Sequence, residues 1–101
     1  MKGRFAVLIA IDFDLTLTAD AELWRRFLED VRQLGHRCVC VTARRDTDEN
    51  RTTVSEWMQM HGIDIPVFFT SLGSKVDFMQ KRGMKVDIWI DDQPGKCALG
   101  H

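Results

Sequence analysis

The alternation of short apolar segments with amphipathic ones is the feature that most constrains how this chain can fold. Four apolar runs have the length of β-strands, at residues 5–11, 37–41, 66–70 and 86–90. Neighbouring runs are separated by segments long enough for one helix each. Strands that alternate with helices in this way form parallel sheets whose faces the helices cover. We therefore predict an α/β fold with a parallel sheet.

Three segments carry helical periodicity and recognisable helix ends, at residues 21–34, 46–61 and 74–82. Asp46 and Glu49 have the spacing of a capping box, and so do Ser74 and Asp77. A glycine follows each segment, where a chain commonly leaves a helix. The residues expected to face the core are Leu23, Phe27, Leu28, Val31 and Leu34 in the first segment and Val54, Trp57, Met58 and His61 in the second.

Length and composition are those of one soluble domain. The 101 residues, 45% of them hydrophobic and 29% charged, suffice for one sheet with flanking helices, so we take residues 1–101 as a single domain. The net charge of −1 does not indicate nucleic-acid binding, although a local basic patch could still form. No apolar stretch is long enough to cross a bilayer, and Asp12 interrupts the apolar start where a signal peptide would continue.

The cysteines also favour a cytoplasmic, reduced protein. Cys38, Cys40 and Cys97 are odd in number and have no CxxC spacing. Cys38 and Cys40 lie two residues apart, on one face of a predicted strand. They could bind a metal, but we interpret them as small buried hydrophobic residues.

Acidic residues follow the first and last apolar runs. Asp12 and Asp14 come after the first run, and Asp91 and Asp92 come after the last. Carboxylates held close together repel each other, so one must take up a proton or a cation must lie between them. The spacing of Asp12 and Asp14 suits a nucleophile with an acid/base group beside it and a bridging divalent ion. Ligands of parallel sheets bind beyond the carboxyl ends of the strands, so these acids and Thr42 are expected on one rim.

Four motifs in this order resemble those of the haloacid dehalogenase-like superfamily. Asp12-Phe-Asp-Leu-Thr16 is similar to its motif I, a strand followed by DxDx[TV], and Val39-Cys-Val-Thr42 is similar to motif II. Lys75 corresponds to motif III and Ile88-Trp-Ile-Asp-Asp92 to motif IV. Leu15 departs from the pattern, because the family often has glycine at this position, where the backbone lies near the phosphate. The motifs span nearly the whole chain.

The resemblance implies a Rossmann-like three-layer fold with strand order 3-2-1-4, in which the motif I strand lies between those of motifs II and IV. It also implies a Mg²⁺-dependent phosphatase that hydrolyses a phosphomonoester. Asp12 would attack phosphorus and form an aspartyl phosphate, and Asp14 would protonate the leaving oxygen and then activate water.

The remaining site residues have roles that the resemblance also implies. Mg²⁺ would be held by an Asp12 oxygen, the backbone carbonyl of Asp14 and one motif IV acid. Asp92 is favoured as the direct ligand, with Asp91 behind it. The Thr42 hydroxyl and the Lys75 ammonium group would bind phosphoryl oxygens.

Plainer interpretations exist for several of these residues. Thr42 could be a structural residue at the end of a strand, and Asp91-Asp92 could form an exposed turn. Lys75 could be solvated, with Lys81 or Lys85 in its role.

The neighbouring loops are less informative. Arg44 and Arg45 follow motif II and either contact substrate phosphate or lie in a solvated loop. Thr16 and Thr18 are expected to stabilise the turn after the first strand through side-chain to backbone hydrogen bonds. Trp24, on the first predicted helix, is expected to pack over a face of the fold.

Two other functions fit parts of the pattern. A degenerate member of the family would bind metal or a partner without turnover. A receiver-like signalling domain would accept phosphate on an aspartate after its third strand, but here the third run ends at Thr70 with no such residue.

Spacing also bears on the substrate. The intervals 17–41 and 43–74 are filled by the predicted helices and one strand, which leaves no room for a cap domain. In this respect the chain is similar to small family members found in bacteria and phages. An open site suits a macromolecular substrate, or a small phosphorylated molecule that a homo-oligomer encloses.

Overall fold

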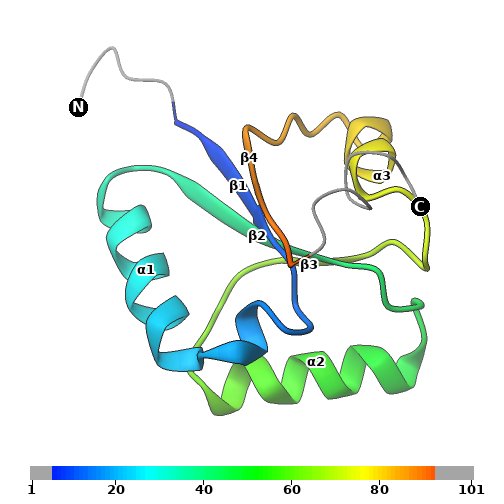
Figure 1. Ribbon diagram of the computed structural model, residues 1–101, viewed down its shortest axis with the longest axis horizontal. Helices are drawn as coiled ribbons and strands as arrows, with labels where there is room; N and C mark the ends of the chain where they lie inside the picture. Colours follow the sequence, from blue (N-terminus) through cyan, green and yellow to red (C-terminus); the bar gives the residue numbers. More distant parts are fainter. Residues whose placement is uncertain (1–5, 93–101) are drawn as a thin grey trace.

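The structure is a computed structural model and describes residues 6–92 (Figure 1). Its elements are β1 (Leu8–Ile11), a 3₁₀ turn η1 (Leu17–Ala19), α1 (Ala21–Gln33), β2 (Arg37–Thr42), α2 (Asp48–Met60), β3 (Val67–Phe69), α3 (Lys75–Lys81) and β4 (Ile88–Ile90). The predicted alternation of strands and helices is confirmed. β1, β3 and β4 are shorter than the apolar runs that predicted them, and Cys97 lies outside the described residues.

The four strands form one parallel sheet in the order β3-β2-β1-β4, as predicted. β1 lies in the interior of the sheet, where Ile11 is in register with Cys40 of β2 and with Ile90 of β4. All strands point the same way, so the loops that follow them gather at one edge (Figure 1). Residues directly after β1 therefore lie between the ends of β2 and β4.

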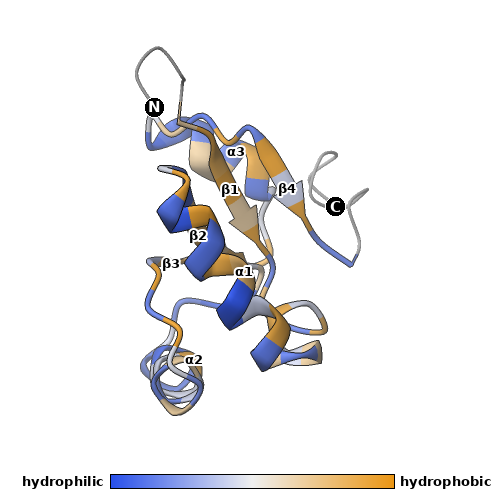
Figure 2. Ribbon diagram, turned by 90° about the vertical axis from the view of Figure 1, so that its left-hand side faces the viewer, coloured by the Kyte–Doolittle hydropathy of each residue, from blue (hydrophilic) through white to orange (hydrophobic). Residues whose placement is uncertain are grey.

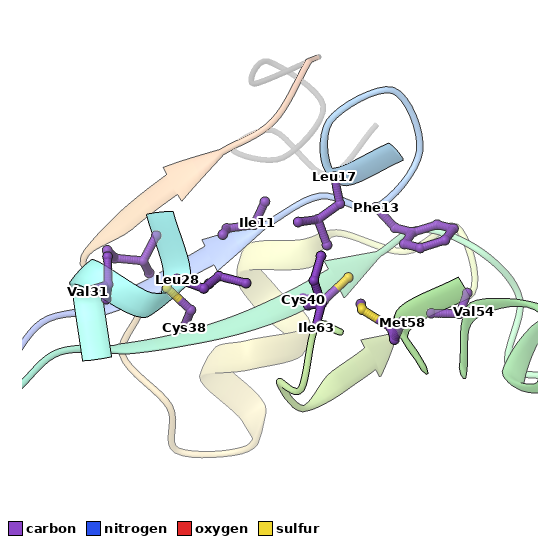
Figure 3. Packing of buried hydrophobic residues seen from close by; sticks show 11 residues of the cluster. Ile11, Phe13, Leu17, Leu28, Val31, Cys38, Cys40, Val54, Met58 and Ile63 are labelled. Atoms are coloured by element: carbon purple, nitrogen blue, oxygen red, sulfur yellow. The ribbon is translucent and has the colours of Figure 1, made fainter. Parts of the chain in front are cut away.

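The two faces of the sheet are separate hydrophobic layers. Odd-numbered residues of β1 and even-numbered residues of β2, among them Ile11 and Cys40, pack with Leu28 and Val31 of α1 and Met58 of α2 (Figure 3). The opposite face packs against α3 through these buried residues: Leu8, Ala10, Val39, Val41 and Met79. Hydrophobic colours follow β1 and β4 in Figure 2, whereas hydrophilic residues are concentrated on α1 and α2. The fold is thus three-layered, as predicted.

Cys38 and Cys40 share one face of β2, as predicted, and both are buried. Burial raises the pKa of the Cys38 thiol to about 11 and raises that of Cys40 further. Thiols in such surroundings stay protonated and behave as small hydrophobic groups.

The core-facing stripe of α1 differs from the prediction at two positions. Leu28 and Val31 are buried and Phe27 is half-buried, but Leu23 and Leu34 are exposed. Trp24 packs against the core in their place, which rotates the stripe to spacings of i, i+3, i+4 and i+7. In α2, Val54 and Met58 are buried as predicted, while Trp57 and His61 are half-buried, with their rings in contact at an interplanar angle of 45°.

Helix starts follow capping chemistry, with one correction. The Ser74 side chain accepts a hydrogen bond from the Asp77 backbone N–H, as predicted. For α2 the predicted cap was wrong, because Thr47 rather than Asp46 accepts from the helix, at the N–H of Asn50. Asp46 makes other contacts instead: its backbone N–H donates to Ser71 Oγ, and its carboxylate forms an ion pair with Arg51.

Each helix is followed, one residue after its C-cap, by the glycine that the sequence indicated, and all three glycines have a positive φ. After α1, the Gly35 N–H donates to the Arg32 carbonyl and the His36 N–H to the Val31 carbonyl. This is the Schellman arrangement, which requires a left-handed residue at the position of Gly35. No helix in residues 6–92 combines the length and the hydropathy that a membrane crossing needs.

Substitution of Gly35 tests this helix end. Its φ is +86°, and a Cβ there would meet nothing within 4 Å, so a side chain costs only backbone strain. We expect Gly35→Ala to lower the free energy of unfolding by about 1 kcal/mol. Gly35→Asn should lose less, because asparagine tolerates the left-handed region. Urea denaturation measures both, and an alanine variant as stable as wild type would contradict this backbone geometry.

Candidate metal and phosphate site

The carboxyl edge of the sheet brings together the acidic residues that the sequence singled out. Asp12 follows β1, Thr42 ends β2, and Asp91 and Asp92 follow β4. The Asp12 N–H donates to the Ile90 carbonyl at 2.9 Å, which continues the pairing of β1 with β4 to the edge itself. The expectation that these residues share one rim agrees with the observed sheet order.

Asp12 is a buried carboxylate, with only 8% of its surface exposed. Burial is the main cause that raises its pKa, to about 6, and the neighbouring Asp91 and Asp92 act in the same direction. Lys75 opposes the shift, because its Nζ donates a hydrogen bond to Asp12 Oδ1 at 2.8 Å. At neutral pH the ionised form of Asp12 therefore depends on nearby positive charge.

Lys75 supplies that charge from the first residue of α3, directly after the Ser74 cap. Its Nζ donates to Asp91 Oδ2 as well as to Asp12 Oδ1. Burial alone would lower the pKa of Lys75, but the two carboxylates outweigh burial and raise it. Lys81 and Lys85 are exposed, so the structure brings Lys75 rather than either of them to the acids.

Asp12, Asp91 and Asp92 form a group that could hold a metal ion. One carboxylate oxygen from each lies within 4.8 Å of the others. Three carboxylates against one ammonium group leave an excess of negative charge, which a divalent cation would balance. The donors are all hard oxygens, the type that Mg²⁺ takes, so the residues present fit the ion expected from the sequence. The choice of Asp92 over Asp91 as direct ligand stays a prediction.

Asp14 has a different environment from Asp12, two residues away. Its side chain is half exposed and lies outside the acidic group. Both of its oxygens accept hydrogen bonds from Arg44, from Nε at 3.0 Å and from Nη2 at 2.9 Å. One of the two carboxylates of motif I is therefore buried against a lysine, and the other lies at the surface against an arginine.

The turn that carries Asp14 is held by contacts with α1 and α2. Phe13 is buried and meets Trp57 edge-to-face, with ring centroids 5.3 Å apart. Trp24 Nε1 donates to the Thr16 carbonyl at 2.7 Å. Figure 3 shows Phe13 together with Leu17 among the labelled core side chains. The indole of Trp24 thus positions the turn, a role that sequence reasoning missed because helical periodicity assigns Trp24 only to packing.

Thr18 and Thr16 differ in their contribution to this turn. Thr18 Oγ1 accepts from the Leu15 N–H at 3.0 Å, as predicted. The prediction for Thr16 was wrong, because its buried hydroxyl has no hydrogen-bond partner within the part of the chain that the structure describes. Leu15, where the family often has glycine, has a φ of +64° and is 72% exposed. Its backbone takes the conformation that glycine adopts without strain.

Thr42 is almost fully buried at the end of β2, and its Oγ1 accepts from the Arg44 N–H at 3.2 Å. The same hydroxyl can still donate its own proton, since a hydroxyl both accepts and donates. Arg44, which the sequence left undecided, is a site-facing residue through its contact with Asp14. Arg45 is exposed. Only proximity to motif II could have indicated Arg44 from the sequence.

No protein-family model, curated protein or solved structure matches this chain. The assignment to a family therefore stays a resemblance that rests on the motifs and their spacing.

The environment of Asp12 predicts how metal-free stability depends on pH. Because the pKa of Asp12 is raised from about 3.9 in the unfolded chain to about 6, the proton stabilises the fold below pH 4, and this contribution is lost as the pH rises through 6. Asp12→Asn avoids the buried charge. We expect it to raise the Tm of the metal-free protein at pH 7.5 and to change it little at pH 4.

Magnesium should reverse this order, because an ion that binds only the folded wild type stabilises it. Differential scanning fluorimetry with EDTA and with Mg²⁺ measures both effects. Asp30→Asn, an exposed position on α1, makes the same change in charge away from the site and controls for it. A variant of Asp12 that is less stable than wild type at pH 7.5 in EDTA would show that the Lys75 contact outweighs the cost of burial.

Proposed function

We propose that this protein is a Mg²⁺-dependent phosphatase of the haloacid dehalogenase-like type, which hydrolyses phosphomonoesters through an aspartyl phosphate. The observation that carries the proposal is the buried carboxylate of Asp12 at the end of β1, hydrogen-bonded to Lys75 and grouped with Asp91 and Asp92. Burial of the Asp12 carboxylate together with the Lys75 ammonium group costs free energy that apolar packing would avoid. Such clusters are typical of functional sites.

Asp12 is the nucleophile in this proposal. Its backbone is held by β4 and its Oδ1 by Lys75, which leaves Oδ2 to attack phosphorus opposite the leaving oxygen. Attack forms the Asp12–phosphorus bond as the bond to the leaving oxygen breaks. The Lys75 ammonium group and the Thr42 hydroxyl proton stabilise the charge on the phosphoryl oxygens.

Asp14 is the acid and base. It gives a proton to the leaving oxygen, and its carboxylate then takes a proton from the water that attacks phosphorus. This attack breaks the Asp12–phosphorus bond, regenerates the Asp12 carboxylate and releases inorganic phosphate. The Asp14 side chain is half exposed, which suits the exchange of protons with solvent. Magnesium, held by Asp12, the Asp14 carbonyl and one of Asp91 and Asp92, would supply charge neutralisation at the phosphoryl group.

A phosphomonoester panel tests the proposal. We expect hydrolysis with Mg²⁺ and loss of hydrolysis with EDTA. The hydrolysis rate of Asp12→Asn should fall to background. Asp92→Asn should need more Mg²⁺ for hydrolysis or be inactive. The matched control Asp30→Asn should keep wild-type turnover. Undiminished turnover in EDTA would rule out the metal-bridged carboxylates.

The two carboxylates can be separated by role. Asp14→Asn keeps the nucleophile but loses proton transfer, so its rate should fall by roughly 10²–10⁴. With an activated substrate, whose leaving group needs no proton, it should be attacked and then stall as the aspartyl phosphate. Rapid-quench mass spectrometry should find phosphate on Asp12 in Asp14→Asn and none in Asp12→Asn. Phosphate on the Asp12 variant would mean that the nucleophile is another residue.

A further inference from the structure

The contact between Arg44 and Asp14 joins the loop after β2 to the turn after β1, thirty residues apart in sequence. Two parallel N–H donors of the guanidinium group meet the two oxygens of one carboxylate. The side chains are 30% and 50% exposed, respectively. An ion pair that is so accessible to water is weak, because solvent screens it, so another anion can displace the carboxylate.

Arg44 is held at the rim by contacts that do not involve Asp14. Its Cζ lies 5.4 Å from the ring centroid of Phe13, which is buried. Its Nη1 donates to Asn50 Oδ1 at 3.0 Å, and Asn50 is itself oriented by its Nδ2, which donates to the Arg45 carbonyl. The guanidinium group therefore keeps its position when Asp14 leaves. The Arg44 backbone N–H donates to Thr42 Oγ1, so Arg44 lies next to a residue that is proposed to bind phosphate.

The same contact is incompatible with the proposed work of Asp14. An acid must carry a proton on an oxygen that points at the leaving group. In the observed contact both oxygens accept N–H donors from Arg44, so neither oxygen points at a leaving group. Asp14 must therefore be released from Arg44 before it can act.

We propose that Arg44 is a phosphate-binding residue that exchanges Asp14 for the substrate. Two non-bridging oxygens of a phosphomonoester offer the guanidinium group the same bidentate geometry as a carboxylate, with two negative charges instead of one. Binding of the dianion transfers Arg44 to the phosphoryl group and frees Asp14 beside the leaving oxygen. The acid becomes available only when a phosphate is present. This inference rests on the proposed function and adds substrate-coupled release of the acid.

A double-mutant cycle on phosphate affinity tests the exchange. Inorganic phosphate is titrated calorimetrically, in Mg²⁺, into wild type, Asp14→Asn, Arg44→Gln and the double variant. If Asp14 competes with phosphate for Arg44, Asp14→Asn should bind phosphate about fivefold more tightly than wild type, the factor expected for an exposed ion pair near the upper end of its strength. Arg44→Gln alone should bind more weakly. The gain from Asp14→Asn should be smaller in the Arg44→Gln background.

Simple charge repulsion between Asp14 and phosphate predicts the opposite order. Without Arg44 to screen it, Asp14 would repel phosphate more, and its replacement would give the larger gain in the Arg44→Gln background. That order, or two equal gains, would overturn the proposal. In an Arg45→Gln background, which removes a neighbouring charge, the gain should match that in wild type.

The folding and the phosphatase activity of the same proteins are measured as controls. Circular dichroism checks each variant, and Arg44→Lys, which keeps the charge but loses the fork, should show a reduced gain if Arg44→Gln fails to fold. If the wild type hydrolyses phosphomonoesters but the gain from Asp14→Asn does not depend on Arg44, the proposed exchange is overturned and the proposed phosphatase activity stands. A wild type that neither hydrolyses them nor binds phosphate would overturn both.

Discussion

The hydrogen bonds from Lys75 to Asp12 and Asp91 are the interactions on which the rim of this protein depends. They join an interior strand, an edge strand and the start of α3 at one buried point. Replacement of Lys75 by a neutral residue would leave both carboxylates without their cation, at a cost of about 3–5 kcal/mol. The packing of α3 through Met79 and the charge state of Asp12 are therefore coupled through one ammonium group.

Asp12 and Asp14 show how one short motif holds two carboxylates with different properties. The strand places Asp12 inside the rim, against Lys75, whereas the turn that Phe13 anchors carries Asp14 outward, to Arg44. Different environments can give two nearby acids different roles. In the proposed mechanism the buried group attacks phosphorus and the exposed one exchanges protons. The same turn is therefore held on one side by the buried Phe13 ring and on the other by a solvent-accessible ion pair with Arg44.

Much of the fold followed from patterns that are local in sequence. The apolar runs, the glycines after each helix and the cap at Ser74 were sufficient because strand formation and helix termination depend on neighbouring residues. The cap of α2 was misassigned because Asp46 and Thr47 are both good capping residues. Contacts of Asp46 with Ser71 and Arg51 decided between them, and Ser71 is distant in sequence.

The sequence by itself determined the order of the elements, and with it which acids end at the carboxyl edge of a parallel sheet, because strand direction follows from short helical crossovers. Only the tertiary structure decided which basic groups meet those acids. Lys75 was one of three candidate lysines, and nothing local distinguished Arg44 from Arg45. Their partners lie on other strands and turns, so the choice depends on sheet order, on the direction in which α3 starts and on the ring of Phe13 beneath Arg44.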